Sequence, residues 1–288
     1  MITKEAIRGT AAELIERAVI YLPEDVVKAL LIALEKEEGI ARTCLQAILD
    51  NIEYAKKNSK PLCQDTGLPV FYVKIGSRAK TDLGAIEEAI RQGVRDATGK
   101  VPLRPNAVHP LTRKNSGDNT GTGMPVVEFE LLGGADYIEM TAFPKGAGSE
   151  NMSALKMLTP SQGISGVKRF VLETVAAAGG NPCPPTIIGV GIGGTADESC
   201  RLSKKALLRP VGSRNSDKSV AALEKDLIDR INALGIGPMG LGGRTTSLAV
   251  HAEYAFCHTA SLPVAVGIQC WANRRATARI TEKKIVFL

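Results

Sequence analysis

Three of the six cysteines lie outside helical patterns, beside proline, glycine or polar residues. For Cys63 and Cys183 chemistry is a better interpretation than packing, and for Cys270 both interpretations stay open. Cys183 stands between two prolines within Asn181–Pro185, so it cannot belong to a regular helix or a continuous strand ladder. Cys63 lies in the segment Pro61–Gly67, which contains proline and glycine, and Cys270 directly follows an apolar run. Thiolates in such places are typical ligands of a metal ion or a metal cluster.

Two kinds of metal site are compatible with three scattered thiolates. Zinc ordinarily takes four ligands and draws them in local pairs, and the chain has no Cys-x-x-Cys pair. An iron–sulfur cluster accepts cysteines from distant parts of a chain. Three cysteines on a four-iron cluster would leave one iron open to act as a Lewis acid on a hydroxyl or carboxylate. Cys44 and Cys200 lie in helical patterns and are interpreted as structural.

Polar groups accompany the thiols in the same kind of segment. Gln64 and Asp65 directly follow the first of the three cysteines, and the glycine-rich loop Lys145–Asn151 comes after a predicted strand. His258 lies near the last of the three cysteines and is a candidate for substrate contact. His251 lies within an apolar strand and is interpreted as a structural residue.

Two glycine clusters also need an interpretation. Gly189–Gly194 fits the G-x-G-x-x-G dinucleotide pattern, but Asp197 and Glu198 would repel a pyrophosphate at the following helix. We therefore predict that these glycines serve a tight turn and close helix packing. The cluster Gly235–Thr246 is compatible with a flexible loop, or with backbone amides that approach an anion, helped by Arg244. Spacing alone leaves both interpretations open.

The elements that must position these groups alternate between helices and strands. Residues 1–58 are predicted as a helical subdomain and residues 59–288 as an α/β cluster-binding region, with an irregular loop over 99–125. The expected fold class is mixed α/β, in which the N-terminal helical segment packs on an α/β region with a mixed sheet. Strands 126–132 and 137–143 are expected to form a hairpin. The other predicted strands cover 68–75, 186–191, 247–252 and 264–269, and the later helices cover 82–98, 159–178, 197–207 and 220–234.

Composition limits the classes of function. The 288 residues carry a formal charge of +6, but the basic residues are spread along the chain and aromatic residues make up only 4%. Nucleic-acid binding is therefore not expected, because stacking platforms for bases need aromatic side chains. No run of about 18 apolar residues exists, so no membrane span is predicted. The start of the chain lacks the apolar stretch of a signal peptide, which favours a cytoplasmic location.

The segments named above resemble a known family. Pro61–Gly67, Asn181–Pro185 and His258–Trp271 resemble the N-terminal region of class I fumarases, and equally the alpha subunits of two-subunit fumarases and L-tartrate dehydratases. Lys114–Asn119 and Lys145–Asn151 fit the same family. The similarity covers nearly the whole chain, and several long motifs in the right order make it specific.

The resemblance implies an enzyme, a hydro-lyase that reversibly hydrates fumarate to malate, and a role for each of nine residues. It implies that Cys63, Cys183 and Cys270 bind a [4Fe–4S] cluster whose fourth iron binds substrate. Gln64, Arg104, Gly146 and Gly148 would contact the substrate, and Asp65 and His258 would be catalytic, with His258 possibly supplied by a neighbouring protomer.

The same resemblance implies a partner. Single-chain members continue into a C-terminal domain that supplies a threonine base, further arginines and a lysine, and that region has no counterpart in this sequence. A separate beta subunit is therefore expected to complete the site, together with self-association of the chain. Two alternatives stay open at this point: an L-tartrate dehydratase alpha subunit, and a non-enzymatic iron–sulfur electron-transfer module, which would need a fourth cysteine ligand.

Overall fold

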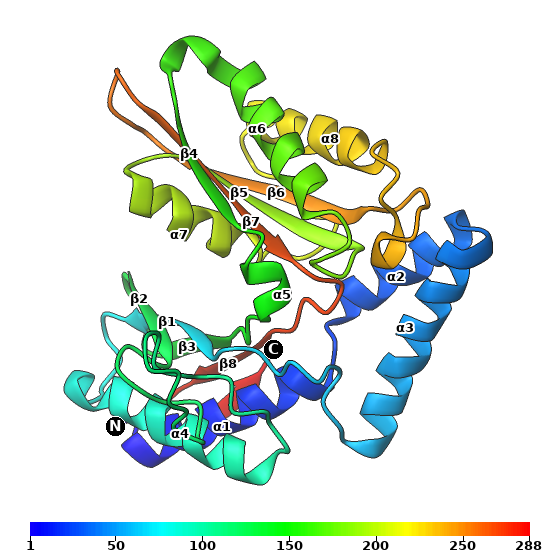
Figure 1. Ribbon diagram of the computed structural model, residues 1–288. Coiled ribbons are helices and arrows are strands. Elements are labelled where there is room, and N and C mark those ends of the chain that lie inside the picture. The colour runs from blue at the N-terminus through cyan, green and yellow to red at the C-terminus, as the bar shows by residue number, and fades with distance from the viewer. The chain divides into compact units, whose positions relative to one another are not determined.

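The computed structural model describes residues 1–288, and their contacts divide the chain into two compact units (Figure 1). Unit 1 consists of Met1–Pro23, Ile52–Gly146 and Arg274–Leu288, and unit 2 consists of Glu24–Asn51 and Ala147–Asn273. The units share residues 1–58 between them. The predicted helical subdomain over 1–58 and cluster-binding region over 59–288 stay a prediction.

Unit 1 is built on a five-stranded mixed sheet with the strand order β2-β1-β3-β8-β9. Helices α1 and α4 pack together on this sheet, where Leu14 and Ile90 join Val73 and Met140 in one buried apolar cluster. The helices follow from apolar residues at three- and four-residue spacing along each of them. The elements of unit 1 are α1 (Lys4–Ile20), β1 (Val70–Gly76), η1 (Leu83–Ala85), α4 (Ile86–Lys100), β2 (Val126–Leu132), β3 (Ile138–Ala142), β8 (Ala276–Ile280) and β9 (Ile285–Phe287).

The predicted hairpin between 126–132 and 137–143 is wrong. Strands β2 and β3 do not pair with each other, because β1 lies between them, parallel to β2 and antiparallel to β3. Strand β1 is apolar and buried along almost its whole length, whereas β2 alternates apolar residues with Glu128 and Glu130 and suits an edge. The link after β2 crosses the end of β1, where the amides of Gly76 and Ser77 donate to the carbonyls of Tyr137 and Leu132.

Unit 2 is built on a four-stranded mixed sheet with the order β4-β7-β5-β6, in which β5 runs parallel to β6 and antiparallel to β7. Helices α6 and α8 cover one face of this sheet and α7 covers the other (Figure 1). Helix α3 (Gly39–Asn58) begins in unit 2 and ends in unit 1. The other elements are α2 (Glu24–Lys36), α5 (Ala147–Glu150), β4 (Ala154–Leu158), η2 (Pro160–Gln162), α6 (Gly163–Ala178), β5 (Thr186–Gly193), α7 (Ala196–Ala206), α8 (Lys218–Asn232), η3 (Pro238–Gly240), β6 (Ser247–Ala255) and β7 (Leu262–Gln269).

The glycines of β5 let α7 lie directly on the sheet. Along β5, Ile188 and Val190 point to the face covered by α6 and α8, and Gly189 and Gly191 point to α7. A Cβ at Gly189 would lie 2.0 Å from the carbonyl oxygen of Ser203, so no larger residue fits there without moving the helix. The interpretation of this motif as close helix packing is confirmed.

Most of the predicted elements are present. The long segment 99–125 contains no helix after Lys100 and no strand, as expected from its composition. Strands β4, β8 and β9 were not predicted; each is short, and β4 and β9 are edge strands. The predicted fold class, mixed α/β with N-terminal helices packed on a sheet region, is confirmed. None of the helices combines the length and the apolar character that crossing a membrane requires.

Candidate functional site

Unit 1 gathers polar groups around Asp65. The carboxylate oxygen Oδ1 of Asp65 accepts hydrogen bonds from the backbone amide of Gly67 at 2.9 Å and from Nδ2 of Asn106 at 3.2 Å. The backbone carbonyl of Asp65 accepts a hydrogen bond from Nη1 of Arg274 at 2.7 Å. These three hydrogen bonds hold the loop before β1 in place, so the fold determines the orientation of the carboxylate.

Arg104 is held beside this loop through its backbone. Its amide donates to Oγ1 of Thr66 at 3.1 Å, and its carbonyl accepts Nδ2 of Asn119 at 3.2 Å. The residue itself is exposed. An anchored backbone with an exposed guanidinium is an arrangement suited to binding a carboxylate in solution. We call Asp65, Thr66, Arg104, Asn106, Gly146 and Arg274 the Asp65 cluster.

Gly146 lies against the same carboxylate. A Cβ at position 146 would stand 3.3 Å from Oδ2 of Asp65 and 3.4 Å from Nη2 of Arg274. Any side chain at position 146 would therefore crowd both the carboxylate of Asp65 and the guanidinium of Arg274. Arg274 is 1% exposed, which makes it the largest fully buried side chain of the chain. A buried guanidinium needs hydrogen-bond acceptors, and the Asp65 carbonyl is one of them.

A second carboxylate, that of Asp118, holds the irregular loop next to the Asp65 cluster. Oδ1 of Asp118 accepts the amide and the hydroxyl of Thr120 at 3.0 and 2.8 Å, and Oδ2 accepts Nε of Arg95 at 3.1 Å. Burial alone would raise the pKa of Asp118, but hydrogen bonds from Ser116 and Thr120, together with Arg95, lower it to about 2. Asp118 is thus charged at neutral pH, and its hydrogen bonds stabilise the conformation of the loop.

Unit 2 brings together Cys183 and Cys270, which are distant in sequence. The backbone amide of Trp271 donates to the carbonyl of Cys183 at 3.2 Å, so the two cysteine segments run side by side. Both thiols are half-buried. The backbone of Cys183 has a positive φ of 56°, a conformation that is uncommon for residues other than glycine. We call residues 179–185 and 269–273 the thiol segments.

Gly148 also belongs to this region of unit 2. A Cβ on Gly148 would lie 3.4 Å from the carbonyl oxygen of Asn181, two residues before Cys183. The side chain of Gln269 donates to the carbonyl of Ala272 at 3.0 Å and so closes the turn that carries Cys270. The structure therefore joins three of the predicted site residues, Gly148, Cys183 and Cys270, within unit 2.

Three further predicted residues lie elsewhere. Cys63 and Gln64 are exposed and directly precede Asp65 in unit 1. His258 is exposed in the link between β6 and β7 of unit 2, where its Nδ1 accepts the amide of Ala260 at 3.1 Å. That bond leaves the proton on Nε2, so neutral His258 offers a donor to a partner in solution.

The three cysteine side chains are the candidate donors for an iron–sulfur cluster. No group of three or more His, Cys, Asp or Glu side chains within either unit is arranged to hold a metal ion. Cys63, Cys183 and Cys270 form no disulfide; Cys63 is an exposed residue and the other two are half-buried. Soft thiolates on irregular backbone suit an iron–sulfur cluster, so the chemistry of the three side chains fits this cofactor.

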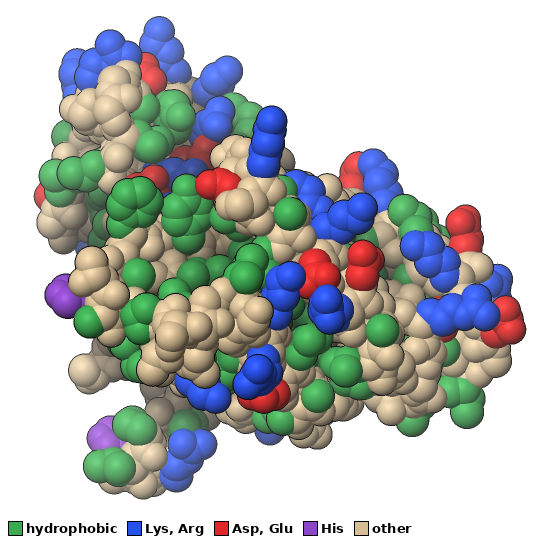
Figure 2. All heavy atoms as spheres, turned by 90° about the horizontal axis from the view of Figure 1, so that it is seen from above, with side chains coloured by type: hydrophobic (Ala, Val, Ile, Leu, Met, Phe, Trp, Pro, Cys, Tyr) green, Lys and Arg blue, Asp and Glu red, His purple; other side chains and the backbone are tan.

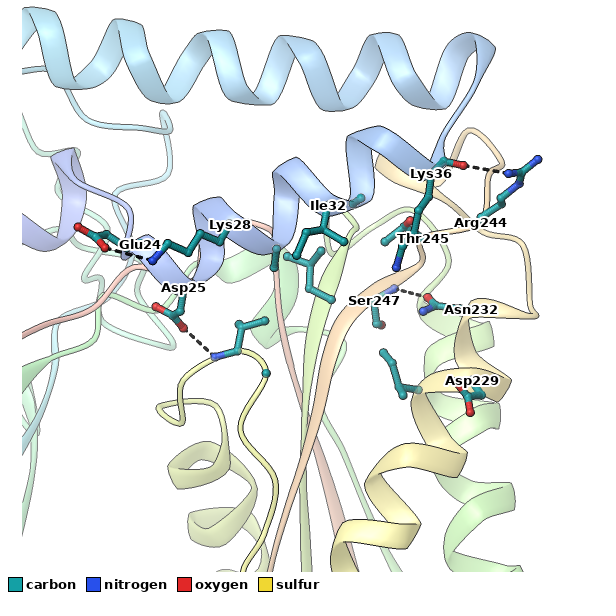
Figure 3. Close-up of a pocket in the computed structure, with 16 residues that line it drawn as sticks. Glu24, Asp25, Lys28, Ile32, Lys36, Asp229, Asn232, Arg244, Thr245 and Ser247 are labelled. Atoms are coloured by element: carbon teal, nitrogen blue, oxygen red, sulfur yellow. Dashed lines mark hydrogen bonds and ion pairs between the residues drawn. The ribbon is translucent and has the colours of Figure 1, made fainter.

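A cavity of unit 2 lies away from all the predicted site residues. It has a volume of about 1000 Å³ and lies between α2, α8 and the start of β6, as Figure 3 shows. A cavity of about 300 Å³ in unit 1 is lined by the loop from Ala107 to Met124. Neither of these two cavities is lined by the predicted site residues. On the face shown in Figure 2, Lys and Arg side chains are spread among Asp and Glu, which matches the dispersed charge of the sequence.

Sequence reasoning missed several members of the Asp65 cluster. Arg274 follows Cys270 closely, and two adjacent arginines after a predicted buried strand are a signal that could have been used. Asn106 and Thr66 carry no such signal, because hydrogen bonds between distant segments appear only once the chain is folded.

The chain matches the model of the family Fumarate hydratase (Fumerase) over residues 8–279. It is 56% identical over 277 residues to a putative L(+)-tartrate dehydratase subunit alpha of Methanocaldococcus jannaschii, which covers 95% of this chain and 97% of that protein. It is 39% identical over 257 residues to the L(+)-tartrate dehydratase subunit alpha of Escherichia coli K12, which covers 89% of this chain and 84% of that protein.

These matches define the class of the protein as a hydro-lyase, an enzyme that adds or removes water. The chain belongs to the fumarate hydratase family. The resemblance found in the cysteine, glycine and histidine motifs is thereby confirmed at the level of the family.

Proposed function

We propose that this chain is the alpha subunit of an iron–sulfur hydro-lyase that reversibly hydrates fumarate to malate. The family match and the subunit names of the relatives support an enzyme of this class with a second subunit. The observation that carries the proposal is the hydrogen bond between Trp271 and Cys183, because it joins two of the predicted ligand segments in unit 2.

The cofactor proposed is a [4Fe–4S] cluster held by Cys63, Cys183 and Cys270. When bound with three cysteine ligands, such a cluster supplies a Lewis acid at the iron that has no protein ligand. The hydration of fumarate involves no net electron transfer, so Lewis-acid chemistry is sufficient. All three cysteines are free of disulfides, and none of the three residues is fully buried, which supports this assignment.

The chain's own residues would bind the dicarboxylate and handle protons. Arg104 would pair with one carboxylate of the substrate, since its backbone is anchored and its side chain is exposed. Gln64 would donate its amide to the substrate, and the backbone amides at Gly146 and Gly148 would add further donors. Asp65 and His258 are the proposed proton-transfer residues of this chain, and the oriented Oδ1 of Asp65 supports that role.

A beta subunit would complete the site and supply the base that removes the proton beside the substrate carboxylate. The relatives carry the designation of alpha subunits, which supports a partner of this kind. The isolated chain is expected to bind the cluster with little or no turnover. A cytoplasmic location and self-association of the chain belong to the same proposal.

A second candidate substrate is L-tartrate. The named relatives are L(+)-tartrate dehydratase alpha subunits, and this observation favours dehydration of tartrate to oxaloacetate in the same scaffold. Fumarate and tartrate are both four-carbon dicarboxylates, so Arg104 and the amide donors would serve either one.

Anaerobic iron–sulfur reconstitution followed by paired assays tests the proposal. The chain is reconstituted, its iron and sulfide are counted, and fumarate, malate and L-tartrate are assayed with and without the candidate beta subunit. We expect four irons per chain and turnover only in the mixture, with the faster substrate identifying the enzyme. A chain that binds no iron under these conditions would refute the cluster assignment.

A further inference from the structure

The glycine-rich loop between α8 and β6 encloses an anion that belongs to the chain itself. Glu37 directly follows α2 and is 3% exposed. Its Oε1 accepts the backbone amides of Arg244 at 2.8 Å and Thr245 at 2.5 Å, and its Oε2 accepts the Arg244 amide at 3.0 Å. The sequence left open whether this loop is flexible or binds an anion through its amides. The anion is a buried carboxylate, so the amides are already occupied.

The side chain of Arg244 links the same loop to α2 a second time. Its Nη1 donates to the carbonyl of Lys36, the last residue of α2, at 3.1 Å (Figure 3). On the inner side, Oδ1 of Asn232 accepts the amides of Thr246 and Ser247, each at 2.9 Å, and the bond to Ser247 is drawn in the same view. The end of the loop is thus fixed to α2 and to α8 by separate sets of hydrogen bonds.

The other end of the loop touches the segment that carries Cys183. The amide of Met239 donates to the carbonyl of Pro184 at 2.8 Å. A Cβ on Gly240 would lie 2.5 Å from the Cα of Gly180, so the two backbones are in direct contact there. Between these ends the loop is compact, because a Cβ on Gly237 would lie 1.9 Å from the carbonyl oxygen of Gly242.

We propose that Glu37 is a positioning residue for Cys183. The carboxylate of Glu37 accepts the loop's backbone amides and so fixes the loop 235–245. The loop in turn contacts the thiol segment 179–185 at Gly180 and Pro184. The inference rests on the proposed function only in its last step, where the position of Cys183 matters for binding the cluster. The support itself is a property of the folded chain without a cofactor.

Hydrogen exchange of the full chain, without cluster, tests the support directly. In Glu37→Ala the amides of Arg244 and Thr245 lose their acceptor and exchange faster whatever the outcome. The informative amides are those of Met239 and Cys183, which we expect to exchange about tenfold faster, since about 1.4 kcal/mol of lost hydrogen bonding changes an opening equilibrium tenfold. Alkylation of the Cys183 thiol, measured against Cys200 in the same chain, should rise in parallel.

Two further variants keep the test decisive. Glu38→Gln is the matched control, because Glu38 is the next residue, its side chain is 84% exposed, and it contacts only the guanidinium of Arg244 in the loop. Glu37→Gln keeps one oxygen acceptor and replaces the other by a nitrogen that cannot accept, so exchange at Met239 and Cys183 should rise by less than in Glu37→Ala but stay faster than in the wild type. It also serves as the test variant if Glu37→Ala does not fold.

The outcomes separate positioning from general loss of stability. Faster exchange confined to 179–186 and 235–246, with strands β1 and β3 unchanged, supports the proposal. Faster exchange throughout the chain, or unchanged exchange at Met239 and Cys183, overturns it. Iron content after reconstitution is measured last: if the wild-type chain binds no iron while the exchange result holds, the proposed function fails and the positioning role stands.

Discussion

The Asp65 cluster of unit 1 is held by side chains that reach across to backbone. Arg274, Asn106 and Thr66 each bond a main-chain or carboxylate group of a neighbouring segment. In unit 2 the side chain of Gln269 closes the turn at Cys270, but the contacts that join the thiol segments to each other and to the loop 235–245 run from backbone to backbone, through Trp271 with Cys183 and Met239 with Pro184. The Asp65 cluster depends on particular side chains. Direct contact between two backbones requires that no side chain lies between them, which explains the glycines near the thiol segments.

This difference has a chemical counterpart. Charged side chains that bind a dianion must be oriented but accessible, and Arg104 has an anchored backbone with an exposed side chain. Thiolates that bind a cluster must not move relative to each other, and directly packed backbones restrict movement more strongly than long side chains do. Substitutions in one unit can therefore be compared with substitutions in the other.

The largest effect is expected from the cysteines. Cys183→Ser, Cys63→Ser and Cys270→Ser should each abolish assembly of a complete four-iron cluster, because no other thiol replaces the missing ligand. Cys200→Ser, in helix α7, should bind iron like the wild type. Iron and sulfide analysis after anaerobic reconstitution measures this. If a fourth cysteine proves equally necessary, the assignment of three ligands and one open iron is wrong.

The next effect is expected from the buried guanidinium of unit 1. Arg274→Ala should lower the free energy of unfolding by about 4 kcal/mol, because it removes a buried charged donor and leaves a cavity. Urea unfolding of the full chain measures the loss. Arg78→Ala is the control in the same unit, since Arg78 is exposed, and its effect should stay within about 0.5 kcal/mol. An equal loss in both variants would show that the buried contacts of Arg274 do not matter.

Unit 2 should be sensitive to mild acid through His251. Burial, reinforced by the charge of Arg209, lowers the pKa of this imidazole from 6.5 to about 4. The unfolded chain therefore takes up a proton first, and stability falls as pH decreases from about 6.5 to 4, by about 3 kcal/mol in total. His251→Gln should flatten this part of the stability curve. A curve that keeps its slope in the variant would assign the acid sensitivity to another group.

The loop of unit 1 that contains Asp118 should respond only in stronger acid, and more weakly. The pKa of Asp118 is lowered from 3.8 to about 2, so its contribution is complete above pH 3.8 and is lost as pH falls through 2. Its side chain is 35% exposed, so solvent screening reduces the contribution to about 1 kcal/mol. Hydrogen exchange of loop 106–120 against pH, in the wild type and in Asp118→Asn, measures it. The prediction fails if loop 106–120 in the wild type opens already between pH 6 and 4.

Much of the molecule could be predicted from the sequence because the signals are local. Periodic apolar residues gave the helices, prolines around Cys183 excluded regular structure, and acidic residues after the motif at 189–194 argued against a nucleotide. The error at β2 and β3 has a physical reason. Two neighbouring strands with a short link look like a hairpin, but the more apolar β1 takes the central position between them.

By itself, the sequence determined the class of fold, the segments that carry chemistry and the residue types available to them. Only the tertiary structure decided that Arg274 lies under Asp65, that Cys183 and Cys270 are neighbours, and that the amides of the glycine-rich loop enclose Glu37. Each of these contacts joins segments far apart along the chain. Such contacts depend on how whole elements pack, and no local pattern of residues encodes them.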